Sequence, residues 1–180
     1  MKREPRPPLI CFLVNTITGG GAEKQLLLIA RGLALRGIVC HVYVLGKVCP
    51  SGRYRALFEA AELAGVEIVA VKSMQFGRKF VKIIWQVLTR SRTLTLWTWG
   101  YRAEVVRVCL PPLWFIRGVF SFRSANRSQF ERWRYLLRFA RPITWRYVSN
   151  SYRAVKLADM LAPGIESKSH VVLNMIEHIL

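Results

Sequence analysis

The sequence predicts an α/β fold built on a doubly wound parallel sheet. Short apolar runs alternate with segments of helical periodicity, and glycines end several of those segments. The first run, residues 9–14, is apolar throughout, which is typical of a strand buried on both faces. A chain of 180 residues, 52% of them hydrophobic, is long enough for one domain with a substantial core. We expect this domain to span residues 1–180.

The N-terminal part is predicted as strand, glycine loop, helix and strand. Gly19, Gly20 and Gly21 precede a helix that ends at Arg36-Gly37, and the next strand covers residues 39–45. A glycine loop at a helix N-terminus lets the backbone approach a phosphate closely and offers it free N–H groups. We therefore predict a phosphate-binding loop. The alternative is a turn that only changes the direction of the chain.

The spacing of these glycines argues against two common nucleotide-binding motifs. A dinucleotide fingerprint needs G-x-G-x-x-G after the strand and an acidic residue about twenty positions later. Here the glycines are contiguous, and the second strand ends at Leu45-Gly46-Lys47 without a carboxylate. The Gly-Lys-Ser/Thr of a P-loop is also absent from the sequence.

The alternation continues to the end of the chain. Gly65 ends a helix of residues 53–64, and residues 149–151 provide the cap of the last helix. The further predicted strands are residues 66–71, 94–99, 119–124 and 143–148, and the further helices are residues 77–88, 128–141 and 152–161. The buried stripe predicted for residues 128–141 is Phe130, Trp133, Leu137 and Ala140.

The charge of the chain points to an anionic partner. Lys and Arg number 28 against 10 Asp and Glu, for a formal net charge of +18. Nucleic acid, anionic lipid and a phosphorylated substrate all fit this balance, and an arginine-rich but ordinary surface is the alternative. The arginines and aromatic residues of residues 128–141 also suit stacking on bases. Nucleic acid nevertheless ranks below membrane and acceptor phosphate, because no nucleic-acid-binding module is present in the sequence.

The helix of residues 77–88 is basic, amphipathic and contains a tryptophan. These properties are typical of attachment to a membrane surface, with Arg78, Lys79, Lys82 and Trp85 facing the lipid. The alternative is a helix that covers the sheet and exposes a solvated basic face.

The compartment is predicted to be the cytoplasm, at the inner face of a membrane. The four cysteines lack metal-ligand spacing and are expected to be free thiols, which indicates a reducing environment and no metal site. No window of about 18–20 residues is free of charge and proline, which argues against a membrane-spanning helix. The basic, proline-rich N-terminus lacks the features of a secretion signal.

A crevice is predicted where consecutive strands end. Ligands of open parallel sheets bind beyond the carboxyl ends of the strands. The crevice is therefore expected to include the glycine loop of Gly19, Gly20 and Gly21 together with residues at the ends of strands 94–99 and 119–124. Of the latter, the candidates for binding an acceptor are Tyr101, Arg102, Glu104, Arg123 and Asn126. Arg102 and Arg123 are permanent cations suited to a phosphate or carboxylate. The alternative for Arg102 and Glu104 is a solvated pair at a helix start.

Several of these segments together resemble the N-terminal domain of GT-B glycosyltransferases of the group 1 (family 4) type. The opening of that family is similar to Gly20-Gly21-Ala22-Glu23 with Arg36-Gly37. The strand ends Thr98-Trp99 and Arg123-Ser124 and the crossing of residues 168–177 also resemble it. Arg102 stands where the family carries a histidine, and Met175 stands where it carries a glycine.

The resemblance implies a Rossmann-like single N-terminal half of a GT-B fold, with the C-terminal nucleotide-sugar domain absent. Such a half binds a lipid-linked or glycan acceptor, and Gly19, Gly20 and Gly21 become a donor-phosphate loop. The function implied is the acceptor-binding half of a retaining glycosyltransferase for envelope polysaccharide or lipopolysaccharide, inactive alone. Its co-substrate is a nucleotide-sugar, with no other cofactor and no catalytic residue assigned. The alternatives are a non-catalytic membrane-docking subunit that pairs with a donor domain and a basic nucleotide- or nucleic-acid-binding protein.

Overall fold

The computed structural model describes residues 8–50, 53–71, 94–123 and 126–173. These residues form two compact units, Met1–Thr95 and Leu96–Leu180. The predicted helix of residues 77–88, with Arg78, Lys79, Lys82 and Trp85, lies outside the described residues. Residues 174–177 of the predicted crossing, Met175 among them, also lie outside.

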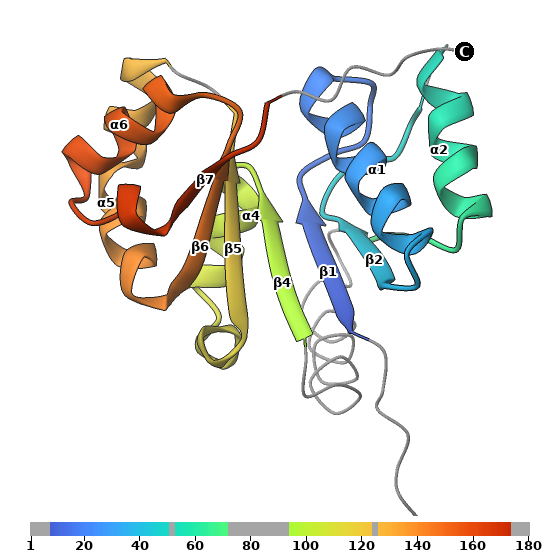
Figure 1. Ribbon diagram of the computed structural model, residues 1–180, viewed down its shortest axis with the longest axis horizontal. Coiled ribbons are helices and arrows are strands. Elements are labelled where there is room, and N and C mark those ends of the chain that lie inside the picture. Colours follow the sequence, from blue (N-terminus) through green and yellow to red (C-terminus); the bar gives the residue numbers. More distant parts are fainter. Residues whose placement is uncertain (1–7, 51–52, 72–93, 124–125, 174–180) are drawn as a thin grey trace, which may run out of the picture. The chain divides into compact units, whose positions relative to one another are not determined.

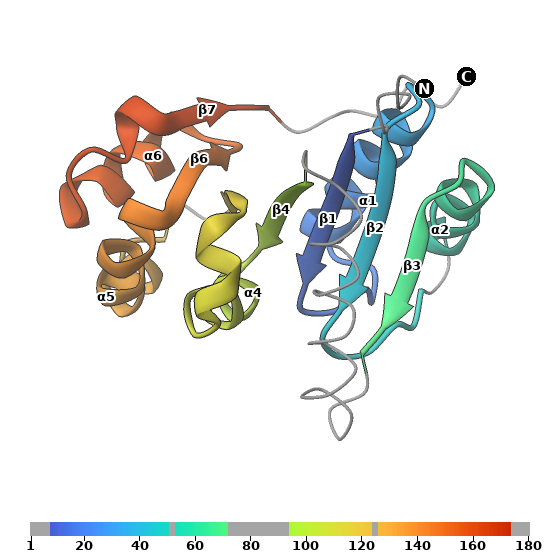
Figure 2. The ribbon, with the colours of Figure 1, turned by 90° about the horizontal axis from the view of Figure 1, so that it is seen from below.

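The first unit is a three-stranded parallel arrangement with helical crossovers. Its elements are β1 (Leu9–Val14), α1 (Gly21–Ala34), β2 (Val39–Val44), α2 (Arg53–Leu63) and β3 (Glu67–Ala70). β1 pairs with β2 from Leu9 opposite Val39 to Val14 opposite Val44, and β2 pairs with β3. The two helices lie side by side (Figures 1 and 2), as right-handed crossovers in one direction require. Five of the six residues of β1 are buried, which confirms the prediction of a strand covered on both faces.

The second unit continues the alternation of strands and helices. Its elements are β4 (Leu94–Trp99), which begins at the boundary of the units, α4 (Tyr101–Val108), η2 (Pro111–Phe115), β5 (Arg117–Phe122), α5 (Arg127–Ile143), β6 (Thr144–Ser149), α6 (Tyr152–Leu161), η3 (Glu166–Lys168) and β7 (Ser169–Val171). β5 pairs with β6 and β6 with β7, both in parallel. The short strand β7 lies within the segment that the sequence predicts only as a crossing.

Aromatic side chains dominate the core of the second unit. The predicted stripe of α5 is buried in full, with Phe130, Trp133, Leu137 and Ala140 turned inward. Phe120 of β5 packs edge-on against Tyr147 of β6, with ring centroids 6.2 Å apart. Such offset contacts contribute beyond the area that the rings bury, and they fix α5 against β5 and β6.

The strands follow the order β3-β2-β1 in the first unit and β4-β5-β6-β7 from the boundary through the second unit. The chain thus has the seven-stranded parallel α/β fold that the alternation of its elements predicts. Among the helices of the described residues, none combines the length and apolarity needed to cross a bilayer.

Candidate functional site

The glycine loop has a backbone that only glycine adopts easily at its first position. Gly19 has φ +113°, and a Cβ there would lie 3.0 Å from Cδ2 of Tyr54 in α2. Gly20 is extended and is the N-cap of α1, which begins at Gly21. A Cβ on Gly21 would meet no atom within 4 Å. The loop is therefore closed over Gly19 by the tyrosine ring and open beside Gly21.

The carboxylate of Glu23 occupies the N–H groups of this loop. The backbone N–H groups of Gly19 and Gly20 donate to its Oε2 at 2.9 and 2.5 Å, and Thr16 Oγ1 donates to its Oε1 at 2.8 Å. Burial acts to raise the pKa of this carboxyl group. Hydrogen bonds, the strongest from Gly20 and Thr16, outweigh burial and hold the pKa below its ordinary value.

This internal contact changes what the loop offers to a ligand. A phosphate at Gly19 and Gly20 has to compete with Glu23 for the same donors. The open side at Gly21 involves no such competition with the surrounding side chains. Binding of a donor phosphate by this loop stays a prediction, and Glu23 is the residue that controls access to its donors.

Of the residues predicted after β4, Tyr101 and Arg102 are at the surface. The Tyr101 ring stacks on Trp133 with centroids 5.4 Å apart, and it keeps an exposed edge. Arg102 is exposed in the first turn of α4. Both are therefore accessible to a ligand, as an acceptor-binding role requires.

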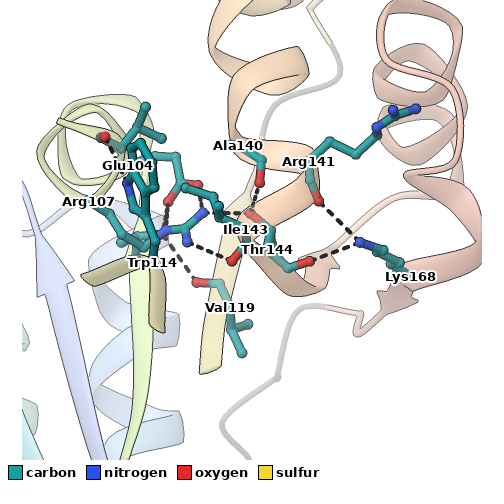
Figure 3. A network of polar contacts seen from close by, with 11 residues as sticks. Glu104, Arg107, Trp114, Val119, Ala140, Arg141, Ile143, Thr144 and Lys168 are labelled. Atoms are coloured by element: carbon teal, nitrogen blue, oxygen red, sulfur yellow. Dashed lines mark hydrogen bonds and ion pairs between the residues drawn. The ribbon is translucent and has the colours of Figure 1, made fainter. Parts of the chain in front are cut away.

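Glu104, predicted at the crevice, is instead completely buried. Its carboxylate forms an ion pair with Arg107, whose side chain is also completely buried, and Arg107 Nε donates to Glu104 Oε2 at 2.9 Å (Figure 3). Thr98 Oγ1 donates to the same carboxylate oxygen at 2.5 Å. The carboxylate therefore holds α4 in the core, and it is not available to a ligand from solvent.

Arg107 completes this network with two contacts to the segment where α5 meets β6. Its Nη1 donates to the carbonyl oxygen of Ile143 at 3.1 Å, and its Nη2 donates to Thr144 Oγ1 at 2.5 Å (Figure 3). Gly118 of β5 leaves the room that this guanidinium needs, since a Cβ there would lie 2.5 Å from Nη1. The sequence analysis missed Arg107; its spacing of three from Glu104 on a helix was the available signal.

Asn126 also has a structural contact. Its Oδ1 accepts hydrogen bonds from the backbone N–H of Ser128 at 3.0 Å and from Ser128 Oγ at 2.9 Å. Asn126 is thus the N-cap of α5. Its predicted part in acceptor binding stays a prediction.

Arg123 is the predicted residue whose surroundings point most directly to a ligand. Its guanidinium carbon lies 4.3 Å from the ring centroid of Trp99, the last residue of β4. Nε, Nη1 and Nη2 are all buried, and none has a hydrogen-bond partner in the part of the chain that the structure describes. This desolvation lowers the pKa of the Arg123 side chain.

Trp99 itself carries a second donor of the same kind. Its Nε1 is buried and has no acceptor among the described residues. The neighbouring Trp97, with its ring centroid 5.8 Å away, donates its Nε1 to Ser121 Oγ at 2.7 Å. Two tryptophans of one strand therefore differ: one indole N–H is satisfied by the fold, and the other is left beside Arg123.

The predicted site residues thus fall into separate groups. The glycine loop belongs to the first unit, and Trp99, Tyr101, Arg102 and Arg123 belong to the second. A single crevice that includes both stays a prediction. Within the described residues there is no group of three or more His, Cys, Asp or Glu side chains able to hold a metal ion.

Comparison with solved structures supports the architecture. The chain is similar to Anabaena HepE in complex with UDP-glucose, with a TM-score of 0.69 and 17% identity over 94% of this chain and 44% of HepE. HepE in complex with UDP and glucose matches with the same TM-score at 15% identity. HepE with UDP alone matches with a TM-score of 0.68 at 17% identity. No family model and no curated protein matches the sequence.

At this level of identity the likeness shows the fold. The chain has a GT-B glycosyltransferase-like fold that spans slightly less than half of the HepE chain, which confirms the fold predicted from the resemblance.

Proposed function

We propose that the chain is the N-terminal, acceptor-binding half of a retaining, nucleotide-sugar-dependent glycosyltransferase in envelope polysaccharide or lipopolysaccharide assembly. Two findings support the class of activity: the GT-B-like fold and the nucleotide-sugar bound in the similar HepE structure. The observation that carries the proposal for this chain is the unpartnered guanidinium of Arg123 on Trp99, at the carboxyl ends of β4 and β5. Ligands of parallel α/β sheets bind at such strand ends.

In this proposal the acceptor lies against the second unit, near Tyr101, Arg102 and Arg123. Tyr101 presents an aromatic edge to a sugar ring, and the two arginines attract a phosphate or carboxylate. The glycine loop contacts the donor diphosphate through its open side at Gly21. The nucleotide-sugar is held mainly by a second domain, from a longer product of the same gene or from a separate subunit.

The proposed place of work is the cytoplasmic face of an anionic membrane. On α5, Tyr135 is 61% exposed and Phe139 is 71% exposed, and the guanidinium carbon of Arg134 lies over the Tyr135 ring, 4.5 Å from its centroid. Exposed aromatic residues beside cations are typical of helices that bind at the lipid interface. The predicted lipid-facing residues Arg78, Lys79, Lys82 and Trp85 are part of the same proposal, although they lie outside the described residues.

Glycosyl transfer requires donor and acceptor at near-attack distance, and much of the rate comes from that positioning. We therefore expect no measurable turnover from common nucleotide-sugars by the purified chain alone. Turnover is expected when a donor domain is co-expressed with it. A coupled assay for nucleoside diphosphate release, with the donor domain alone as control, measures both.

The outcomes of this assay separate the proposal from its alternative. Turnover that requires both proteins supports the acceptor-binding half. Formation of a complex without turnover, for every acceptor tried, identifies a non-catalytic docking subunit. Turnover by the purified chain alone contradicts the division of labour proposed here.

A further inference from the structure

Two arginines of the second unit, the fully buried Arg107 and the partly buried Arg123, have guanidinium nitrogens with opposite surroundings. Every side-chain nitrogen of Arg107 donates a hydrogen bond, to Glu104, Ile143 or Thr144. The three nitrogens of Arg123 are equally shielded from solvent and donate to no acceptor in the described part of the chain. Compared with Arg107, Arg123 is therefore exceptional in that its shielded nitrogens donate no hydrogen bond within the described residues.

The lack of hydrogen bonds at Arg123 is informative because it lowers the stability of the folded chain. A buried polar group without a hydrogen bond destabilises a protein, and a buried unpaired cation does so more strongly. The Trp99 ring stabilises the guanidinium through its face but accepts no conventional hydrogen bond. An acceptor that arrives with a ligand removes this cost.

The arrangement also selects the chemistry of the ligand. The guanidinium is a planar fork of N–H donors, which matches the paired oxygens of a phosphate or carboxylate. Its contact with the Trp99 ring restricts its orientation, and the unsatisfied Nε1 of Trp99 adds a neutral donor nearby. A group with several negatively charged oxygen atoms uses all of these donors.

We propose that Arg123 and Trp99 form a binding site for a phosphate group of the substrate. The identity of the phosphate rests on the proposed function, which offers two sources. One is the diphosphate of the nucleotide-sugar donor, and the other is the phosphate of a lipid-linked acceptor. The same donors serve either source, so the experiment includes both.

The test measures binding to the full chain by isothermal titration, with UDP, inorganic pyrophosphate and a short-chain polyprenyl phosphate as probes. Arg123→Gln is expected to weaken binding at least tenfold, and Trp99→Phe, which keeps the ring face and removes the N–H, several-fold. Arg117→Gln is the matched control, because Arg117 also lies over a tryptophan, 5.4 Å from the Trp145 centroid, but is exposed. Binding of UDP and pyrophosphate identifies the donor side, and binding of the polyprenyl phosphate alone identifies the acceptor side.

A second measurement guards against a variant that simply unfolds. Without ligand, Arg123→Met removes an unpaired buried cation, so its thermal midpoint is expected to equal or exceed that of the unmodified chain. A bound probe should raise the midpoint of the unmodified chain and leave that of Arg123→Met unchanged. A lowered midpoint of Arg123→Met without ligand assigns a structural role to Arg123 and overturns the inference. The inference is also overturned if Arg123→Gln binds the probes as tightly as the unmodified chain does. It is overturned as well if the unmodified chain binds none of the probes.

These results are separable from the test of the proposed function. Normal turnover of Arg123→Gln with a donor domain removes the phosphate site and leaves the glycosyltransferase proposal intact. Phosphate binding that depends on Arg123, with no turnover in any combination, supports the phosphate site and contradicts the glycosyltransferase proposal.

Discussion

At the scale of single residues, the glycine loop shows that neighbouring glycines have different roles. Gly19 combines a positive φ with a close tyrosine ring, whereas Gly21 is in the first turn of α1 and faces open space. Glycine is therefore required at Gly19 by the positive φ and by the nearby Tyr54 ring. At Gly21 there is space for a ligand to approach.

We expect Gly19→Ala to lower the free energy of unfolding by about 1–3 kcal/mol, because alanine is strained at this φ and its Cβ meets Tyr54. Gly21→Ala is the matched control and should be neutral or stabilising by up to about 1 kcal/mol, since it restricts the unfolded chain without strain. Urea unfolding of both variants measures the difference. Equal effects would show that the loop conformation at Gly19 is not as described.

Glu23 is the second residue whose contacts predict a measurable property. Its pKa in the folded state lies below the ordinary value of 4.5, so the folded carboxylate contributes stability above that value. That contribution is lost as the pH falls through the folded pKa. Glu23→Gln should therefore be less stable than the unmodified chain by about 1 kcal/mol at pH 7, a typical value for a charged group at a helix N-terminus.

This difference between Glu23→Gln and the unmodified chain should shrink toward zero in urea unfolding series from pH 7 to pH 3. Glu59→Gln is the control, because Glu59 forms only an exposed ion pair with Arg55 and should cost little at any pH. A gap for Glu23→Gln that is constant with pH would show that the carboxylate charge is not what the loop stabilises.

At the scale of elements, the buried ion pair joins α4 to the rest of the second unit. Arg107 reaches Glu104 on its own helix and Ile143 and Thr144 at the end of α5 and the start of β6. Loss of one partner leaves the other charge buried and unpaired. We therefore expect Arg107→Met to lower the free energy of unfolding by about 3–5 kcal/mol.

Removing both charges tests the reason for this loss. Glu104→Leu combined with Arg107→Met should be more stable than Arg107→Met alone, because no unpaired charge remains. Arg127→Met, which breaks an exposed ion pair with Glu131, should change stability by at most about 1 kcal/mol. Urea unfolding compares the three, and a loss below 1 kcal/mol for Arg107→Met would contradict the network.

The exposed face of α5 has residues with two different tasks. Arg138 Nε donates to the carbonyl oxygen of Leu161 at 3.0 Å, and Arg141 donates to the carbonyl oxygen of Pro163. These contacts hold the C-terminal end of α6, whose last carbonyl groups have no partner within the helix. Arg134 and Phe139 remain for a surface role.

On this basis Arg134→Gln with Phe139→Ala should reduce co-sedimentation with vesicles of anionic lipid, since each surface cation contributes on the order of 1 kcal/mol there. The triple change of Arg78, Lys79 and Lys82 to Gln tests the other predicted lipid surface. Arg55→Gln with Leu63→Ala, an exposed cation and an exposed apolar residue of α2, is the control. Binding should weaken with salt, and no binding by the unmodified chain would end the membrane proposal.

At the scale of the whole molecule, the net charge of +18 gives the docking proposals a common basis. A field of one sign attracts phosphate-bearing ligands and anionic lipid alike and does not distinguish them. Specificity has to come from local geometry, and our proposals place it at the loop at Gly21 and at the donors of Arg123 and Trp99. In these proposals the charge attracts anionic ligands to the surface, and the two sites select among them.

Much of the fold was predictable from the sequence because the signals are local. The apolar run of β1, the glycines around α1 and the buried stripe of α5 depend on neighbours within one or two turns. Each of these patterns can be recognised within a short stretch of the sequence. They place β1–β6 and the helices α1, α2, α5 and α6 with boundaries shifted by one or two residues, whereas α4 and β7 were not among the predicted helices and strands.

The chemistry of the candidate site depends on contacts between residues that lie far apart in the sequence. Glu104 appears as a crevice carboxylate in the sequence, but its partner Arg107 is fixed by Thr144, 37 residues away. Arg123 acquires its meaning only beside Trp99, on the preceding strand. Periodicity identifies the face of a helix that is buried, but whether a buried charge finds a partner depends on which distant residues the fold brings against it.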